Sequence, residues 1–447
     1  DAFLNKEFHK KQNFFSFSDI DSERKDRIMK FTSTEATPAP HVPPGVLRLT
    51  GAAKEDIPMY RIQTMNKISP VGLNRFPSEL YEVGDAVQDP QGILVRSAKL
   101  LDLEFNPSLL AIARAGVGVN NIPLDRCAAA GIPVFSTPGA NANAVKELVI
   151  CAMLMGSRDI PGAIRWVREQ AASGVDVSTV VEKGKSAFIG PELYKKTLGI
   201  IGLGAIGSIV ANTAISLGMD VYGYDPFLSV DTALRLDRHV HVVKDINDLY
   251  KRSDYITMHI HYTEKTAHMI DADAIAAMKR GVRVINLARG EIVDDEAMLT
   301  ALDTGMVAAY ITDFPNNRLL TAPHVIAMPH LGASTPESEQ NCAAMAVDTL
   351  RDYLESGNIR SSVNLPEMTM DRSGVQRLCV LHKNVPGMLA NITSLFGRDG
   401  VNVENLSNKS RGDYAYTMVD LGSKVGDNVI EDVRRTANVI RVRSLEW

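Results

Sequence analysis

The stretch IIGLGAIGSIV, residues 200–210, places three glycines in the pattern G-x-G-x-x-G, at Gly202, Gly204 and Gly207. The apolar run TLGII ends just before these glycines and predicts a strand, and IVANTAISLG after them predicts a helix. The following run, DVYGYD, predicts a second strand that ends in Asp225, close to the roughly 20-residue spacing of a ribose-binding acid. The glycines alone are equally typical of a plain strand-to-helix turn. Their context favours a dinucleotide site.

This pattern has a physical explanation at each position. Gly204 lets the backbone approach a pyrophosphate, and Gly207 lets the helix pack closely on the strand. The helix begins at Ala205 and Ile206, so its N-terminus offers oriented amides and a partial positive charge. Asp225 can accept hydrogen bonds from both ribose hydroxyls and would repel a 2'-phosphate. The sequence therefore predicts NAD rather than NADP as the cofactor.

Composition limits the other function classes. The chain has 447 residues, is 45% hydrophobic and 23% charged, and carries a formal net charge of -5. Such a balance indicates globular domains without the basic surface that nucleic acid requires, and no apolar stretch reaches the roughly 20 residues of a membrane span. Four scattered cysteines and ten histidines show neither metal-site nor disulfide spacing that favours a metal or an oxidising compartment. We expect a small-molecule partner and a cytoplasmic location.

The chain divides into segments of different character. Residues 1–58 form a polar leader with a proline-rich linker, and a fragment, a fusion remnant or a misplaced start would each explain it. From Met59, strand-like runs alternate with helical ones, which predicts parallel, doubly wound α/β sheets. After Pro366 the order of runs is βαββαβ, which predicts a separate ferredoxin-like domain.

Four motifs in a fixed order reveal a resemblance that covers residues 59–447: GLGAIG with YDP, NLARGEIVDDEAM, MPHLGAST, and HKNVPGML with DGVNV. The chain resembles the D-isomer-specific 2-hydroxyacid dehydrogenases, and within them the members that oxidise 3-phospho-D-glycerate and carry a C-terminal ACT domain. The resemblance implies a Rossmann-type NAD-binding domain at 151–334, inserted in a flavodoxin-like substrate domain at 59–150 and 335–365, and an ACT domain at 375–447.

The same resemblance assigns the catalytic groups. Arg289 in NLARGE would hold the substrate carboxylate and polarise the forming carbonyl, and His330 in MPHLGAST would act as acid and base. Without these motifs, an arginine at a strand end usually forms a surface ion pair. A histidine beside a proline is then usually a loop residue whose ring is hydrogen-bonded. The implied reaction is NAD-dependent oxidation of 3-phospho-D-glycerate to 3-phosphohydroxypyruvate, the first step of the phosphorylated route to L-serine.

One departure from the family pattern concerns the partner of the histidine. The family has a glutamate shortly after this strand end that orients the histidine, and in TDFPNNRLL the residue at that position is Asn317. An amide can orient an imidazole but adds no charge to stabilise its protonated form. Asp313, which the resemblance assigns to the cofactor, would compensate only if its strand turned it inward. The departure leaves open a weakly active regulatory protein that binds NAD and an amino acid.

On the substrate side, LVRSAKL matches a phosphate-binding loop at Arg96, Ser97 and Lys99, with alanine where a second basic residue is frequent. In RAGVGVNNI, the backbone amides of Val117 and Gly118 could cradle a carboxylate, although a simple tight turn explains them too. The charge on this loop favours 3-phosphoglycerate over the related substrates glyoxylate and hydroxypyruvate.

In the tail, His382, Asn384 and Asn402 match positions that hold L-serine between paired ACT domains. The alternative is a dimerisation module whose polar loop residues cap a helix. The resemblance also implies a homodimer or homotetramer. We expect a domain rotation to be absorbed by the linker SVNLPEMTMDRSG, residues 362–374, and by a hinge where Asn141 caps a long helix.

Overall fold

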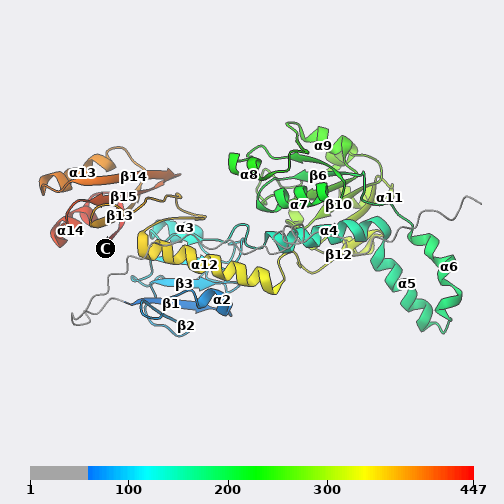
Figure 1. Cartoon of the computed structure of the whole chain (residues 1–447), viewed down its shortest axis with the longest axis horizontal. Coiled ribbons are helices and arrows are strands. Elements are labelled where there is room, and N and C mark those ends of the chain that lie inside the picture. The colour runs from blue at the N-terminus through cyan, green and yellow to red at the C-terminus, as the bar shows by residue number, and fades with distance from the viewer. Residues whose placement is uncertain (1–58) are drawn as a thin grey trace, which may run out of the picture. The chain divides into compact units, whose positions relative to one another are not determined.

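The structure, a computed structural model, describes residues 59–447 (Figure 1). The leader that we predict over residues 1–58 lies outside the described residues. No helix of the described part is long and apolar enough to cross a membrane.

The first part of the described chain forms a five-stranded parallel sheet in the order β2-β1-β3-β4-β5. This is the strand order of flavodoxin. A late helix, α12, returns to pack on this sheet, and its buried residues share a core with those of the strands. The elements are β1 (Tyr60–Met65), α2 (Pro70–Leu73), β2 (Tyr81–Gly84), β3 (Gly92–Val95), β4 (Ala111–Arg114), α3 (Leu124–Ala129), β5 (Val134–Phe135) and α12 (Pro336–Ser356).

The middle of the chain forms a seven-stranded parallel sheet in the order β12-β11-β10-β9-β6-β7-β8. From β8 to β11 this is the Rossmann strand order. All strands are parallel, and the order in which successive strands are added reverses between β6 and β9. Its elements are β6 (Thr197–Ile201), α7 (Ala205–Ser216), β7 (Asp220–Tyr224), α8 (Val230–Arg235), β8 (Val240–Val242), α9 (Ile246–Arg252), β9 (Tyr255–Met258), α10 (Ala272–Ala276), β10 (Val282–Asn286), α11 (Asp295–Asp303), β11 (Val307–Thr312) and β12 (Val325–Ala327). The prediction of an α/β fold with parallel sheets is confirmed.

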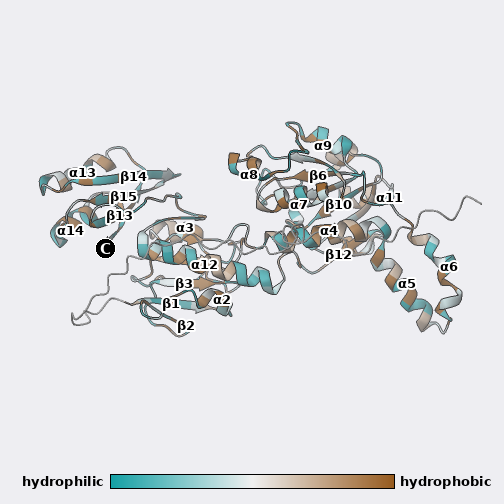
Figure 2. Cartoon of the chain, viewed as in Figure 1, coloured by the Kyte–Doolittle hydropathy of each residue, from teal (hydrophilic) through white to brown (hydrophobic). Residues whose placement is uncertain are grey.

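Helices cover both faces of this sheet. Buried residues of α7 and of the connecting helix α4 (Ala142–Arg158) pack on one face, and those of α9, α10 and α11 pack on the other. The predicted long helix is α4, and Asn141 lies at its N-cap position. The Asn141 side chain makes no capping hydrogen bond, contrary to our expectation. After α4 come α5 (Ile160–Ala172) and α6 (Val181–Gly184), and Figure 2 shows hydrophobic residues among the hydrophilic ones of α5.

The tail forms a four-stranded antiparallel sheet in the order β14-β15-β13-β16. The chain runs βαββαβ, as the sequence predicts, which is the ferredoxin-like order. Its two helices cover one face, where their buried residues share a core with the strands. The elements are β13 (Gln376–Lys383), α13 (Met388–Arg398), β14 (Val403–Arg411), β15 (Tyr414–Leu421), α14 (Asp427–Arg435) and β16 (Val439–Glu446).

The segment between α12 and the tail is packed rather than loose. Leu365 and Met368 are buried, and Met368 exchanges two backbone hydrogen bonds with Ile359. The expected role of residues 362–374 as a rotating linker therefore conflicts with their packing in this state. The cause is that apolar side chains in this segment join the core of the first sheet.

Candidate active site

The glycine turn after β6 has the geometry of a phosphate-binding turn. Gly202 has a φ of +90°, and a Cβ there would lie 2.6 Å from the carbonyl oxygen of His259, so only glycine fits. Gly204 is exposed at the N-cap of α7, and a Cβ built on it would meet nothing within 4 Å. The backbone is therefore open to a ligand at Gly204.

The helix that follows begins in the same exposed place. Ala205 is exposed and Ile206 half-buried, whereas Gly207 is buried against the carbonyl group of Gly202. A side chain at Gly207 would collide with that carbonyl, so glycine permits the close contact of helix and strand. The first backbone N–H groups of α7, a helix of 12 residues, have no acceptor within the helix. They can donate to an anion, and the helix dipole adds a partial positive charge there.

Asp225 follows β7 and faces this turn. One carboxylate oxygen accepts a hydrogen bond from the backbone N–H of Leu203 at 2.9 Å, and the other accepts from that of Phe227 at 2.8 Å. The carboxylate is thus fixed beside the glycines, and each oxygen keeps a lone pair for a further donor. Two ribose hydroxyls are suitable donors for these lone pairs.

Asp313 is a second acidic residue of the candidate cofactor site. It follows β11, has 1% of its surface exposed, and accepts a hydrogen bond from the backbone N–H of Gly332 on Oδ2 at 2.9 Å. Its Oδ1 is buried and accepts no hydrogen bond from any of residues 59–447. Burial raises the pKa of Asp313, which the Gly332 bond and the nearby His330 oppose. An unpartnered buried acceptor suits a donor such as the amide of a nicotinamide ring, so the residues fit a bound dinucleotide.

His330 lies in a strained loop beside Asp313. Its φ of +44° is unusual for a residue with a side chain, and its backbone N–H donates to the carbonyl of Asp313 at 2.8 Å. The exposed imidazole ring packs on the ring of Phe314, with 4.7 Å between centroids. The strand end therefore turns Asp313 inward and holds it close to His330.

Arg289 comes from the loop after β10 and meets the first domain. Its Nη1 donates to the carbonyl of Ala288 at 2.6 Å, and its guanidinium lies 5.8 Å from the centroid of Phe314. A Cβ built on Gly118 would lie 3.1 Å from its Nη2. The side chains of Arg289 and His330 thus both lie beside the ring of Phe314. The loop of Val117 and Gly118 lies against Arg289.

Arg96, Ser97 and Lys99 follow β3 and are all exposed. The side chain of Asn66, at the end of β1, accepts hydrogen bonds from the backbone N–H of Ser97 at 3.1 Å and of Ala98 at 2.5 Å. The carboxyl ends of neighbouring parallel strands thus form one site, as is typical of open α/β sheets.

Arg114 is a site residue that the sequence reasoning missed. It ends β4, and its Nε donates to the carbonyl of Arg96 at 2.9 Å. Burial lowers the pKa of Arg114, and so does repulsion from Arg289 and Arg96. The available signal was its position at the carboxyl end of a buried strand, where ligands of parallel sheets bind.

Asn317 is not brought to His330. It is exposed, and among the described residues no hydrogen bond joins the two. The neighbouring Asn316 explains this, because its Oδ1 accepts from the backbone N–H of Arg318 and Leu319 and turns the chain into a short 3-10 helix. Asp313, by contrast, lies next to His330, whose charge lowers the pKa of its carboxyl group.

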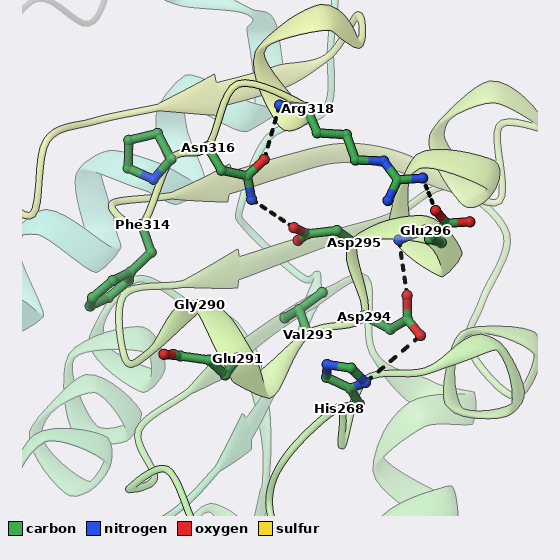
Figure 3. A pocket seen from close by; sticks show the side chains of 11 residues that line it. His268, Gly290, Glu291, Val293, Asp294, Asp295, Glu296, Phe314, Asn316 and Arg318 are labelled. Carbon is green, nitrogen blue, oxygen red and sulfur yellow. Dashed lines mark hydrogen bonds and ion pairs between the residues drawn. The ribbon is translucent and has the colours of Figure 1, made fainter.

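A pocket of about 500 Å³ opens beside Gly290 and Phe314 (Figure 3). Its lining includes four acidic residues, three of which are already engaged: Asp294 with His268, Asp295 with Asn316, and Glu296 with Arg318. The negative lining disfavours an anionic substrate. We therefore place the substrate among the arginines rather than in this pocket.

The three predicted serine ligands lie apart within one chain. His382 is buried, with Nδ1 at 2.8 Å from the carbonyl of Lys383 and Nε2 at 2.9 Å from Thr417 Oγ1. Asn384 lies at the Tyr414 end of β15, since its backbone N–H donates to Asp413. Asn402 lies at the other end, where its carbonyl accepts from Gly422. The points to which they bond, Asp413 and Gly422, flank the eight-residue strand β15 and lie about 30 Å apart along it.

The turn, the fixed acid and the arginine–histidine pair together define a dinucleotide-binding dehydrogenase. Residues 150–332 match the family model described as "D-isomer specific 2-hydroxyacid dehydrogenase, NAD binding domain". The chain belongs to the D-isomer specific 2-hydroxyacid dehydrogenase family. The predictions of this family and of NAD as the cofactor are confirmed.

Named relatives give the degree of similarity. A D-3-phosphoglycerate dehydrogenase of Synechocystis is 36% identical over 71% of this chain and 56% of its own length. One from Escherichia coli is 31% identical over 81% of this chain and 89% of its own length. The chain spans 55 to 60% of the length of three relatives, the D-3-phosphoglycerate dehydrogenases of Synechocystis, Methanocaldococcus jannaschii and Bacillus subtilis. The NAD⁺-bound crystal structure of 3-phosphoglycerate dehydrogenase from Entamoeba histolytica is 26% identical, with a TM-score of 0.54, over 68% of this chain and 99% of that one.

Proposed function

We propose that this protein uses NAD to oxidise 3-phospho-D-glycerate to 3-phosphohydroxypyruvate. The observation that carries the proposal is the meeting of Arg96, Arg114 and Arg289 in the half of the site next to His330. Of the three, only Arg96 has an acidic partner among the described residues, Glu339, so three cations in one place favour an anionic ligand. 3-Phosphoglycerate supplies a carboxylate and a phosphate. The names of the relatives support the same substrate.

The residues have complementary roles in this reaction. Arg289 binds the substrate carboxylate through its planar fork and polarises the oxygen that becomes a carbonyl. His330 removes the hydroxyl proton and holds it on its imidazole. NAD, when bound, accepts the hydride from the carbinol carbon. The carboxylate of Asp313 provides a negative charge near the imidazole of His330.

The remaining residues bind the rest of the substrate. Arg96 and Arg114 hold the phosphate, with Lys99 as an additional cation on the same loop. The backbone amides of Val117 and Gly118 support the carboxylate beside Arg289. Glyoxylate and hydroxypyruvate lack a phosphate and would leave two cations without a ligand.

The experiment compares His330→Ala and Arg289→Ala with wild type. We expect both variants to lose NADH formation from 3-phospho-D-glycerate by at least about 10³-fold, while NAD binding stays within about twofold. Retention of more than a tenth of the wild-type rate by either variant would contradict its assigned role.

We further infer that the tail is an ACT domain and that L-serine inhibits the enzyme, as the first step of a route to serine would require. The βαββαβ order and the antiparallel sheet support this. Because Asn384 and Asn402 lie at opposite ends of β15, one serine can contact both only between two copies of the chain. A homodimer or homotetramer follows from the proposal.

Serine titration at fixed substrate tests this inference. Wild type should be inhibited by millimolar serine, and Asn402→Ala should be several-fold less sensitive. Equal sensitivity of Asn402→Ala and Asn384→Ala to that of wild type would show that serine binds elsewhere, and insensitivity of wild type would leave the tail as a dimerisation module.

A further inference from the structure

The side chain of Arg96 is held by a residue from a distant part of the chain. Its Nη2 donates to Oε1 of Glu339 at 2.5 Å, and Glu339 lies in the first turn of α12. We propose that Glu339 is a positioning residue that holds Arg96 in the site for a phosphorylated substrate. This inference rests on the function proposed above and adds a residue to it.

The need for such a residue comes from like charges. Arg114 lies close enough to Arg96 and Arg289 for the positive charges of both to lower its pKa. Arg96 is the exposed member of the three and has a long, flexible side chain. Without a counter-charge, repulsion directs it toward solvent, away from the place where a phosphate would bind.

The rest of the loop is already fixed, so only the Arg96 side chain remains to be placed. Asn66 holds the N–H groups of Ser97 and Ala98, and the side chain of Asn121 donates to the carbonyl of Ala98 at 2.7 Å. Glu339 takes a single nitrogen of the guanidinium. Nη2 carries two N–H groups and Glu339 takes one of them. One of the two forks that Nη2 forms, with Nε or with Nη1, therefore stays available for an oxyanion.

Glu339 itself stands on a rigid element. Thr335 caps the start of α12 by accepting from the backbone N–H of Ser338 at 3.1 Å. At the other end, Arg443 donates to the carbonyls of Tyr353 and Leu354 at 3.1 and 2.9 Å.

Further bonds from the tail hold the same end of α12. Arg377 donates to the carbonyl of Ser356 at 2.9 Å, and the hydroxyl of Tyr416 donates to that of Gly357 at 2.6 Å. The antiparallel domain thus holds the C-terminal end of the helix whose N-terminal turn carries Glu339. A helix fixed at both ends places its carboxylate reproducibly.

The size of the effect follows from the exposure of the pair. Both side chains are 44% exposed, so the pair adds little to stability. The pair fixes the Arg96 side chain before the substrate binds, so binding does not have to immobilise it. Loss of Glu339 should therefore raise KM by about threefold to tenfold. A purely electrostatic role predicts the opposite sign, because removing a negative charge attracts an anionic substrate.

The test measures kcat and KM for 3-phospho-D-glycerate in wild type, Glu339→Gln and Arg96→Ala, and in the double variant. Glu337→Gln is the matched control, since Glu337 is exposed in the same helical turn and forms no ion pair with any described residue. We expect Glu339→Gln to raise KM with kcat within about twofold, and Glu337→Gln to match wild type. In the Arg96→Ala background, the Glu339 substitution should have no further effect.

A fall or no change in KM for Glu339→Gln, or an equal rise for Glu337→Gln, would overturn the proposal. So would an undiminished effect of Glu339→Gln in the Arg96→Ala background. Calorimetric binding of 3-phospho-D-glycerate without NAD separates this outcome from failure of the proposed function. If wild type binds the compound but does not oxidise it, the reaction is wrong while the role of Glu339 is still measured by the binding constants.

Discussion

Replacing the buried Asp313 with asparagine should stabilise the protein while reducing its activity. Asp313 is 1% exposed, and its Oδ1 accepts no hydrogen bond within the described part of the chain, so its negative charge is poorly compensated. Burying an ionised carboxylate costs more than burying a neutral amide, even when the N–H groups of the amide have no partner at this position. Asparagine keeps an acceptor for the Gly332 N–H but removes the charge. We expect a gain of about 1–2 kcal/mol, or roughly 2–8 °C in Tm for a domain of this size.

The gain should depend on pH with a definite sign. Burial raises the pKa of Asp313 above its usual 3.8, so between 3.8 and the raised value the folded state binds more protons than the unfolded state. The penalty of the charged carboxylate is therefore full above the raised pKa and disappears below 3.8. The stability advantage of the Asp313→Asn variant should shrink as the pH falls from 7.5 toward 4.

Thermal unfolding at pH 7.5 and 4.5 checks this, with Asp220→Asn, an exposed residue of the same sheet, as the control. The Asp313→Asn variant should also lose at least about tenfold in kcat/KM, because the protonated His330 loses its counter-charge. A Tm at or below that of wild type at pH 7.5 would refute the reasoning about the unpartnered carboxylate.

Three other outcomes are expected. Asp225→Ala should gain use of NADP, since the carboxylate that repels a 2'-phosphate is gone; initial rates with both cofactors measure this, and a loss of NADP use would contradict it. Asn317→Glu should leave the pH–rate profile unchanged, because residue 317 is exposed and unconnected to His330; a raised apparent pKa of the histidine would show that the loop closes over it during turnover. Burial lowers the pKa of His259 to about 4, so the unfolded state binds the extra proton between pH 6.5 and 4, and stability should fall with decreasing pH there by up to about 1.4 kcal/mol per pH unit. Urea unfolding across this range checks the slope, and a His259→Gln variant with an equally steep slope would assign the loss to other groups.

The sequence predicted what depends on local pattern. The glycine turn, the acid after the second strand and the βαββαβ order of the tail each follow from residues close together in the chain. Turn geometry and hydrophobic periodicity are local properties, so they are visible without a fold.

The contacts that depend on long-range packing were missed. Arg114 joins the site only because β3 and β4 are neighbours in the sheet, and Glu339 reaches Arg96 across 243 positions of the chain. Asn317 failed as a partner of His330 because Asn316 turns the loop away, while Asp313 is directed inward by the end of β11. The orientation of one side chain at a strand end is set by tertiary structure and leaves no periodic signal.

Packing also decides what can move. The segment 362–374 has the proline and polar residues of a linker, yet Leu365 and Met368 are buried in the core of the first sheet. A valine, a leucine and two methionines among polar residues were the signal that this segment packs. A flexible composition does not exclude a few apolar anchors that fix the chain.

We propose above that the arginines of the site recognise a phosphorylated 2-hydroxyacid for oxidation by NAD. The most direct measurement is the initial rate of NADH formation from 3-phospho-D-glycerate against D-glycerate, which lacks only the phosphate. Two arginines making charge-assisted hydrogen bonds, each contributing about 1.5–3 kcal/mol, predict a kcat/KM higher for the phosphorylated compound by about 10²–10⁴-fold. Equal efficiency with the two compounds, or no turnover of 3-phospho-D-glycerate, would contradict the account.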